Sequence, residues 1–177
     1  ASTLNKSFEF TILTPMPKHE VVAEITLYNN EGGLQTYCTH RINPNDKLIR
    51  NFDGRTAVEH EYLLKNGSAA ECIDIAIMAE GYTAEEMDIF LKDARTACDE
   101  IFRYEPFASH KEKFNVVAVK NISKQSDVSV PQDDLWRETA LNSNFMTFYS
   151  PRYLTTNSVH NIHDNLIGVA YEHLIIL

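Results

Sequence analysis

The amino-acid sequence predicts a mixed α/β protein, with a β-rich beginning followed by an α/β unit. Apolar and polar residues alternate through much of the first 50 positions, which is typical of strands with one exposed face. A nearly continuous apolar segment follows at 72–81, as expected of a strand that is covered on both faces. A helical pattern and a second apolar segment come next, so we expect a βαβ unit with a right-handed crossover.

Residues 1–56 are predicted to supply β-strands. Segments 8–12, 21–27 and 34–42 alternate in hydropathy, and the turn-forming sequence at 29–33 joins the last two into a hairpin. A β-sandwich needs two sheets to enclose a core, so three strands are too few. We therefore expect a partial sandwich that is incomplete on its upstream side.

A helix is predicted directly after the apolar strand. Thr83 can cap its first turn, and the Glu86 carboxylate can reach back to the Thr83 amide, which together make a capping box. Opposite charges four residues apart, as at Asp99 and Arg103, would lie on the exposed face. The buried face is predicted from apolar residues spaced by three and four: Met87, Phe90, Leu91, Ala94, Cys98, Ile101 and Phe102.

Shorter elements surround this helix. The segment 114–122 is predicted as a second buried strand, and the segment before Asn66–Gly67 as a short extended stretch closed by a turn. A short helix is expected within 158–168. The apolar residues at 172–177 are predicted as a third buried strand.

Composition excludes some classes of function. The chain has 177 residues, a formal net charge of −9 and no dense cluster of Lys and Arg, so a phosphate-binding face for nucleic acid or an anionic membrane is not expected. No apolar run approaches the length of a transmembrane helix. Cys38, Cys72 and Cys98 are too few and too far apart for a disulfide framework, and Cys98 is expected to be a buried thiol.

A possible metal site lies near the end of the sequence. His160, His163 and Asp164 are residue types that bind zinc, and positions i and i+3 share a helix face. The catalytic H-E-x-x-H motif instead has histidines at i and i+4 with a glutamate base between them. We favour a polar helix surface for these residues and keep a metal site as the alternative.

Other candidate groups are also weak. Glu172 and His173 are neighbours in a predicted strand and should therefore point to opposite faces. Asp74 interrupts an apolar strand, so its carboxylate must be paired, and a structural role is favoured. Ser129 and Ser143 have no histidine nearby in the sequence. The aromatic residues Phe145, Phe148, Tyr149 and Tyr153 are expected to pack in the core rather than form a ligand platform.

Several segments together resemble a known family. In this order along the chain, "PNDKLIR", "EYLLKNGS", "CIDIAIMAEGYTAEEM", "LNSNFMTFYSPRYLTT" and "YEHLIIL" are similar to the IgA peptidase family of bacterial zinc metalloendopeptidases. The resemblance extends from about Phe8 to Leu177. It implies that residues 1–56 are the C-terminal strands of a β-sandwich-like N-terminal domain. It also implies that residues 57–177 are the N-terminal part of a zincin-like catalytic domain.

The resemblance implies zinc catalysis in the parent protein but supplies no site residue in this chain. Family members bind zinc through a helical H-E-x-x-H motif, and the zinc activates water for peptide hydrolysis. No histidine here is followed by that pattern; His60–Glu61, for example, has Leu64 at the position of the second histidine. We therefore assign no catalytic, metal-binding or cofactor-binding residue to this chain.

The expected function is that of an internal fragment of an exported zinc endopeptidase, inactive alone. Its substrate would be a protein, with immunoglobulin A as the activity that gives the family its name. Open sheet edges would be covered by the rest of the polypeptide or by a second copy. Extracellular, periplasmic or cell-surface location is implied by the resemblance. The alternative is a non-catalytic exported module that binds a surface protein or a glycan.

Overall fold

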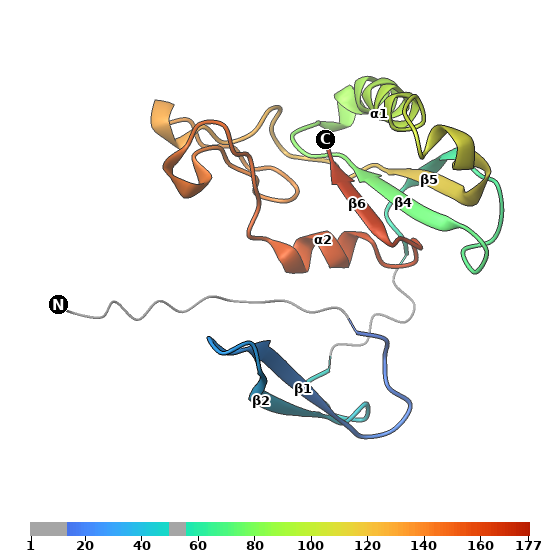
Figure 1. Ribbon diagram of the computed structural model, residues 1–177. Coiled ribbons are helices and arrows are strands. Elements are labelled where there is room, and N and C mark those ends of the chain that lie inside the picture. The colour runs from blue at the N-terminus through green and yellow to red at the C-terminus, as the bar shows by residue number, and fades with distance from the viewer. Residues whose placement is uncertain (1–13, 50–55) are drawn as a thin grey trace. The chain divides into compact units, whose positions relative to one another are not determined.

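The computed structural model describes residues 14–49 and 56–177, in two compact units that divide at residues 53 and 54 (Figure 1). The boundary predicted from the sequence lies between residues 56 and 57. Mixed α/β content is confirmed.

The first unit contains a β-hairpin, as predicted. Strand β1 (Val21–Tyr28) pairs antiparallel with β2 (Leu34–Ile42), and a bulge interrupts the register between Ile25 and Thr26. Asn29 closes the turn, because its Oδ1 accepts hydrogen bonds from the amides of Glu31 and Gly33. Most apolar side chains of this hairpin are exposed. The strand predicted at 8–12 lies outside the described residues.

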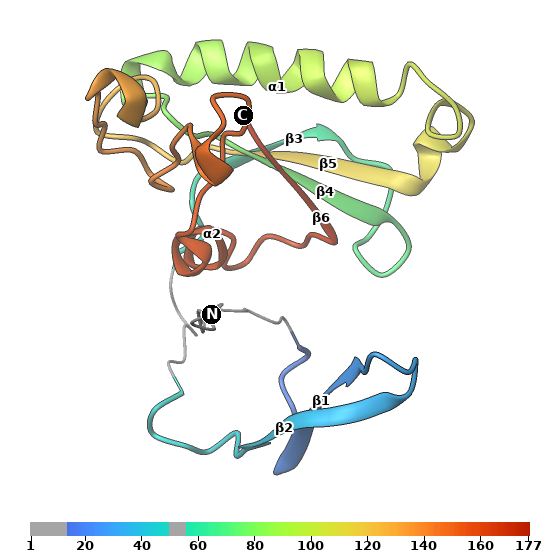
Figure 2. The ribbon, with the colours of Figure 1, turned by 60° about the vertical axis from the view of Figure 1, so that its left-hand side comes forward.

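The second unit is built on a four-stranded sheet within residues 56–177, with strand order β3-β5-β4-β6 (Figure 2). Its strands are β3 (His60–Leu64), β4 (Ile73–Met78), β5 (Phe114–Val119) and β6 (His173–Ile176). Strands β5, β4 and β6 run parallel, and β3 is antiparallel to β5. The predicted βαβ unit is therefore confirmed as β4, α1 and β5.

Helices cover opposite faces of this sheet. Helix α1 (Met87–Ile101) lies on one face and α2 (Val159–Asn165) on the other (Figure 2). The α1 side buries Phe90, Ala94 and Cys98 against alternate residues of β4 and β5. Burying one large side chain such as Phe90 contributes about 2–3 kcal/mol, so this apolar stripe stabilises α1 far more than any surface ion pair. The α2 side has its own apolar cluster, which includes Met78, Leu141 and Leu166.

Short 3₁₀ segments punctuate the connections: Ala84–Glu86, Ala108–Lys113, Pro131–Asp133 and Thr147–Tyr149. The capping interaction predicted at Thr83 is present, because the Thr83 amide donates to Glu86 Oε2 at 2.9 Å. No helix within residues 14–49 and 56–177 has the length and hydropathy that a membrane span requires.

Two details of the prediction are wrong. Strand β6 is only half-buried, because it lies at the edge of the sheet as far as the described residues extend. The sequence shows its apolar character but not the identity of its neighbours. Just beyond the end of α1, Arg103 bonds Glu100 at 2.9 Å rather than Asp99, since residues three apart also lie close together on a helical turn.

Candidate functional site

One well-connected polar group of the second unit is the buried carboxylate of Glu80. It lies just beyond the carboxyl end of β4 and is 5% exposed. Oε1 accepts hydrogen bonds from Thr139 Oγ1 at 2.6 Å and from the Ser143 amide at 2.8 Å. Oε2 accepts one from the Leu141 amide at 2.8 Å. Glu80 therefore fixes the segment 139–143 against the end of the strand.

Gly81 brings a second part of the same connection close to β4. Its φ is +75°, and a Cβ built there would lie 2.8 Å from the Asp127 carbonyl oxygen. Its carbonyl accepts from the Asp127 amide at 2.8 Å, and its amide donates to Ser123 Oγ at 3.0 Å. A side chain at position 81 would prevent the Asp127 backbone from lying this close to β4. Glu80 and Gly81 together therefore hold residues 123–143 against the end of the strand; we call this pair the docking point.

A crevice of about 440 Å³ opens beside this docking point, at the carboxyl ends of the parallel strands. Crevices at this end of an open α/β sheet are common ligand sites. Its wall includes Tyr82, whose hydroxyl donates to Asp93 Oδ2 at 2.9 Å. Burial and this hydrogen bond raise the pKa of Tyr82 to about 12. Hydrogen bonds from the Thr83 amide and the Ser126 hydroxyl lower the pKa of Glu86, which also lines the crevice.

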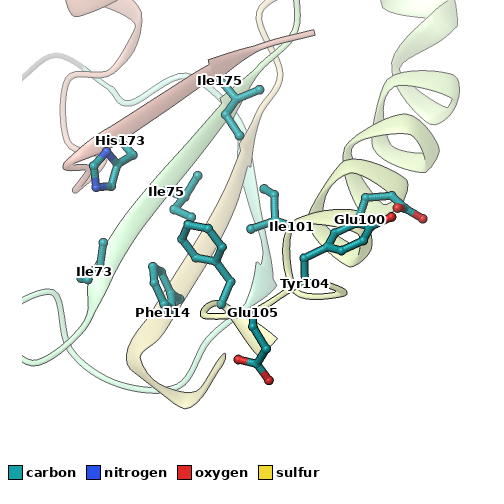
Figure 3. Close-up of a pocket in the computed structure, with 10 residues that line it drawn as sticks. Ile73, Ile75, Glu100, Ile101, Tyr104, Glu105, Phe114, His173 and Ile175 are labelled. Atoms are coloured by element: carbon teal, nitrogen blue, oxygen red, sulfur yellow. The ribbon is translucent and has the colours of Figure 1, made fainter. Parts of the chain in front are cut away.

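A larger, apolar pocket of about 520 Å³ lies between the end of α1 and strands β4 and β6 (Figure 3). The side chains of Ile75, Ile101 and Phe114 converge in it, while the carboxylates of Glu100 and Glu105 point away from them. An apolar pocket of this size suits an apolar group. It contains no pairing of a nucleophile with a base.

The histidines near the end of the sequence do not converge on a metal position. His160 is exposed on α2, and His163 Nδ1 lies 2.7 Å from the Tyr171 hydroxyl, with the two rings stacked. Throughout residues 14–49 and 56–177, no group of three His, Cys, Asp or Glu side chains could hold a metal ion. These residues therefore do not fit zinc, and we derive no catalytic step through it.

Asp74 has a structural partner for one of its two carboxylate oxygens, while its buried Oδ2 has no hydrogen-bond partner among the described residues. It is 1% exposed, and its Oδ1 accepts from Asn115 Nδ2 at 2.9 Å on the neighbouring strand. Asn115 Oδ1 in turn accepts from the amides of Asn66 and Gly67 at 2.8 Å and 3.2 Å. Glu172 Oε2 accepts from the Asp74 amide at 2.5 Å. Glu172 therefore helps to join β6 to β4, while its neighbour His173 lines the apolar pocket.

Ser129 and Ser143, which were considered as nucleophiles from the sequence, instead make hydrogen bonds that involve the backbone. Ser129 Oγ accepts from the Arg137 amide at 2.9 Å, and the Ser143 amide donates to Glu80. Neither is bonded to a histidine in any contact among the described residues.

The prediction that the aromatic cluster packs in the core is wrong. Phe148 is 81% exposed, Tyr149 is 96% exposed and Tyr153 is 48% exposed. Phe148 and Tyr149 have φ of 56° and 60°, which turns the chain in a way that apolar character does not predict. Phe145 is partly buried and lines the crevice beside Glu80.

Sequence reasoning also missed Glu80 and Asn115. Both are polar residues within or beside apolar strands, and that was the signal that identified Asp74. Their partners lie more than forty positions away along the chain, so no local pattern connects them.

The sequence holds a second His-Glu pair besides His60–Glu61, at His19–Glu20. Ala23 stands at the position where H-E-x-x-H requires the second histidine, so this pair does not form the motif either.

Comparison with known families gives a match over the second unit. The family described as IgA Peptidase M64 matches residues 62–177, which is more than half of the chain and spans the sheet from β3 to β6. Among curated proteins, none matches the chain significantly.

Proposed function

Because the chain belongs to the IgA peptidase M64 family, we propose that it forms part of a zinc-dependent endopeptidase that hydrolyses peptide bonds in proteins. The observation that carries the proposal is the extent of the family match, which includes the whole second unit except its first few residues. The substrate proposed is a protein, with immunoglobulin A as the first to test. Export from the cell is proposed with it, since an immunoglobulin substrate lies outside the cell.

The role proposed for these 177 residues is that of scaffold. Zinc, when bound to such an enzyme, would polarise the scissile carbonyl and activate water. The described residues offer no ligand set for it, and the sequence contains no H-E-x-x-H. We therefore place the zinc ligands in a part of the enzyme that these residues do not include. What this chain supplies is a rigid sheet, with Glu80 and Gly81 holding the long connection at the carboxyl end of β4.

The test compares two proteins: this chain and the natural polypeptide that contains it. Each is purified, its zinc content is measured by mass spectrometry, and immunoglobulin A and casein are offered as substrates. We expect the natural polypeptide to cleave in a way that a chelator abolishes and added zinc restores. We expect this chain to cleave neither substrate. Cleavage by this chain, with stoichiometric zinc bound, would show that the scaffold role is wrong.

A second candidate function is non-catalytic binding to a surface protein or glycan. The exposure of Phe148, Tyr149 and Tyr153 favours it, because rings in contact with solvent are available to a partner. The two functions are compatible, since a protease domain can carry a separate binding surface. Binding without chelator-sensitive cleavage by the natural polypeptide would favour the second over the first.

A further inference from the structure

The loop between residues 144 and 156 presents aromatic rings to solvent. Phe148 and Tyr149 are 81% and 96% exposed, and Tyr153 and Leu154 beside them are nearly half exposed. The rings of Phe148 and Tyr153 meet edge to face, with centroids 6.1 Å apart. In Figure 1 this part of the chain, coloured orange to red-orange, lies to one side of the sheet. We call residues 145–155 the aromatic loop.

The aromatic loop is held by specific contacts at its base. Asn144 and Thr155 exchange backbone hydrogen bonds of 2.9 Å and 3.1 Å. The hydroxyls of Thr147 and Thr155 lie 2.6 Å apart, and the Phe145 amide donates to the Ser129 carbonyl at 3.0 Å. These contacts fix the two ends of the loop side by side, so the rings are presented from a defined base.

The backbone turns the rings outward at a cost in free energy. The backbone φ angles of Met146, Phe148 and Tyr149 are 67°, 56° and 60°. They lie in the left-handed region, which residues other than glycine rarely occupy. Two of these strained residues are also the two most exposed rings of the loop. Neither backbone strain nor exposed apolar surface stabilises the fold. A segment that combines the two is typical of a ligand-binding site, where binding is the benefit that offsets their cost.

The chemistry around the rings is polar and nearly uncharged. From Thr139 to His163, Arg152 is the single residue among Asp, Glu, Lys and Arg, although such residues make up 23% of the whole chain. The same stretch is rich in side chains that donate and accept hydrogen bonds without charge: Asn142, Asn144, Thr147, Ser150, Thr155, Thr156, Asn157 and Ser158. Several of these side chains already bond within the unit, as Thr147 does with Thr155 and Asn142 with Ser158. The Asn157 side chain is exposed, and the Ser150 hydroxyl accepts from the Arg152 amide and keeps its own hydrogen to donate. A charged ligand would have little to select it here, whereas a neutral ligand with hydroxyl groups can pair with side chains such as Asn157 and Ser150.

We propose that the aromatic loop binds a neutral oligosaccharide, with the apolar faces of its pyranose rings stacked on both Tyr149 and Phe148. Sugar rings combine a flat C–H face with a rim of hydroxyls, which matches exposed rings next to amides and hydroxyls. This surface goes beyond the peptidase proposal and does not depend on it, since binding requires no cleavage.

Two other occupants fit less well. Protein hot spots lie in packed, desolvated pockets, and neither Phe148 nor Tyr149 lines the crevice beside Glu80 or the apolar pocket. An anionic membrane surface attracts clusters of Lys and Arg, and this loop carries Arg152 in a chain of net charge −9. A neutral sugar requires neither a deep pocket nor a basic cluster.

The test is calorimetric titration of the purified chain with neutral probes, namely chitotriose, maltotriose, cellotriose and N-acetyllactosamine. We expect saturable binding of at least one of them. Tyr149→Ala and Phe148→Ala should each weaken it about tenfold, because a stacked ring is lost. Tyr149→Phe should bind as the unchanged chain does, and Tyr149→Leu should bind as weakly as the alanine variant. Tyr28→Ala removes a ring that is 74% exposed in the separate hairpin unit and should have no effect.

Several outcomes would overturn the proposal. One is the failure of all four sugars to bind a chain whose circular dichroism shows it to be folded. A second is binding that Tyr149→Leu leaves unchanged. A third is competition in which an unglycosylated polypeptide, such as reduced carboxymethylated lactalbumin, displaces the sugar and occupies the loop more tightly.

Discussion

Glu80 and Ser143 are 63 positions apart in the sequence, yet the Glu80 carboxylate accepts a hydrogen bond of 2.8 Å from the Ser143 backbone amide in the interior of the second unit. The same carboxylate also accepts from Thr139 and Leu141. A charged group buried at 5% exposure is tolerated because donors surround both of its oxygens. This contact attaches the long connection after β5 to the carboxyl end of β4.

Replacing Glu80 should therefore destabilise the second unit. In Glu80→Ala the donors of Thr139, Leu141 and Ser143 lose their acceptor, and we expect a loss of about 3–4 kcal/mol in the free energy of unfolding. Glu80→Gln keeps an acceptor oxygen and should lose about half as much. Urea unfolding followed by circular dichroism measures both. Glu112→Gln, at an exposed glutamate, is the control and should change stability by less than about 0.5 kcal/mol. Equal losses in Glu80→Ala and the control would contradict the role assigned to Glu80.

Gly81→Ala should destabilise the same unit for a steric reason. The new methyl group would meet the Asp127 carbonyl oxygen at 2.8 Å, on a backbone with φ of +75°. We expect a loss of about 2–4 kcal/mol, of which about 1 kcal/mol comes from the left-handed conformation. Gly168→Ala is a matched comparison, since its φ is +79° and its nearest neighbour is the Ala57 methyl at 3.3 Å. A similar loss in both variants would mean that the close approach of Asp127 adds nothing.

The contact between Asp74 and Asn115 should show energetic coupling. Asn115→Ala removes a donor to Asp74 and the acceptor of the Asn66 and Gly67 amides, so we expect a loss of about 2–3 kcal/mol. Asp74→Ala should leave the Asn115 amide short of a partner. A double-mutant cycle measured by urea unfolding should give a coupling of about 1–2 kcal/mol. Strictly additive losses would show that the two side chains act independently.

Stability should fall at alkaline pH partly because of Tyr82. Burial and the hydrogen bond to Asp93 raise its pKa from 10.0 to about 12 in the folded protein. The folded state thus favours the protonated phenol, so this contribution is complete below pH 10.0 and is lost as the pH rises toward about 12. Tyr82→Phe removes the titrating group, and its unfolding free energy should decline less steeply across that interval. Parallel curves for the two proteins would contradict the assignment.

Regular elements could be predicted because their signals are local. The alternation in 21–42 gave the hairpin, and the apolar runs at 72–81 and 114–122 gave the two central strands. Polar contacts such as Glu80 with Ser143 could not be predicted, because burial joins residues that no sequence period relates. The aromatic loop was predicted as core since ring size and hydropathy suggest burial. Its exposure follows from left-handed backbone at Phe148 and Tyr149, which neither residue type favours.

The central claim is that this chain is the scaffold part of a zinc endopeptidase. Its most direct test is cleavage of immunoglobulin A by the natural polypeptide that contains these residues, measured before and after removal of zinc. The account predicts cleavage that a chelator abolishes and zinc restores, together with no cleavage by residues 1–177 alone. Cleavage that persists unchanged in the chelator would contradict it, as would cleavage by residues 1–177 with zinc bound.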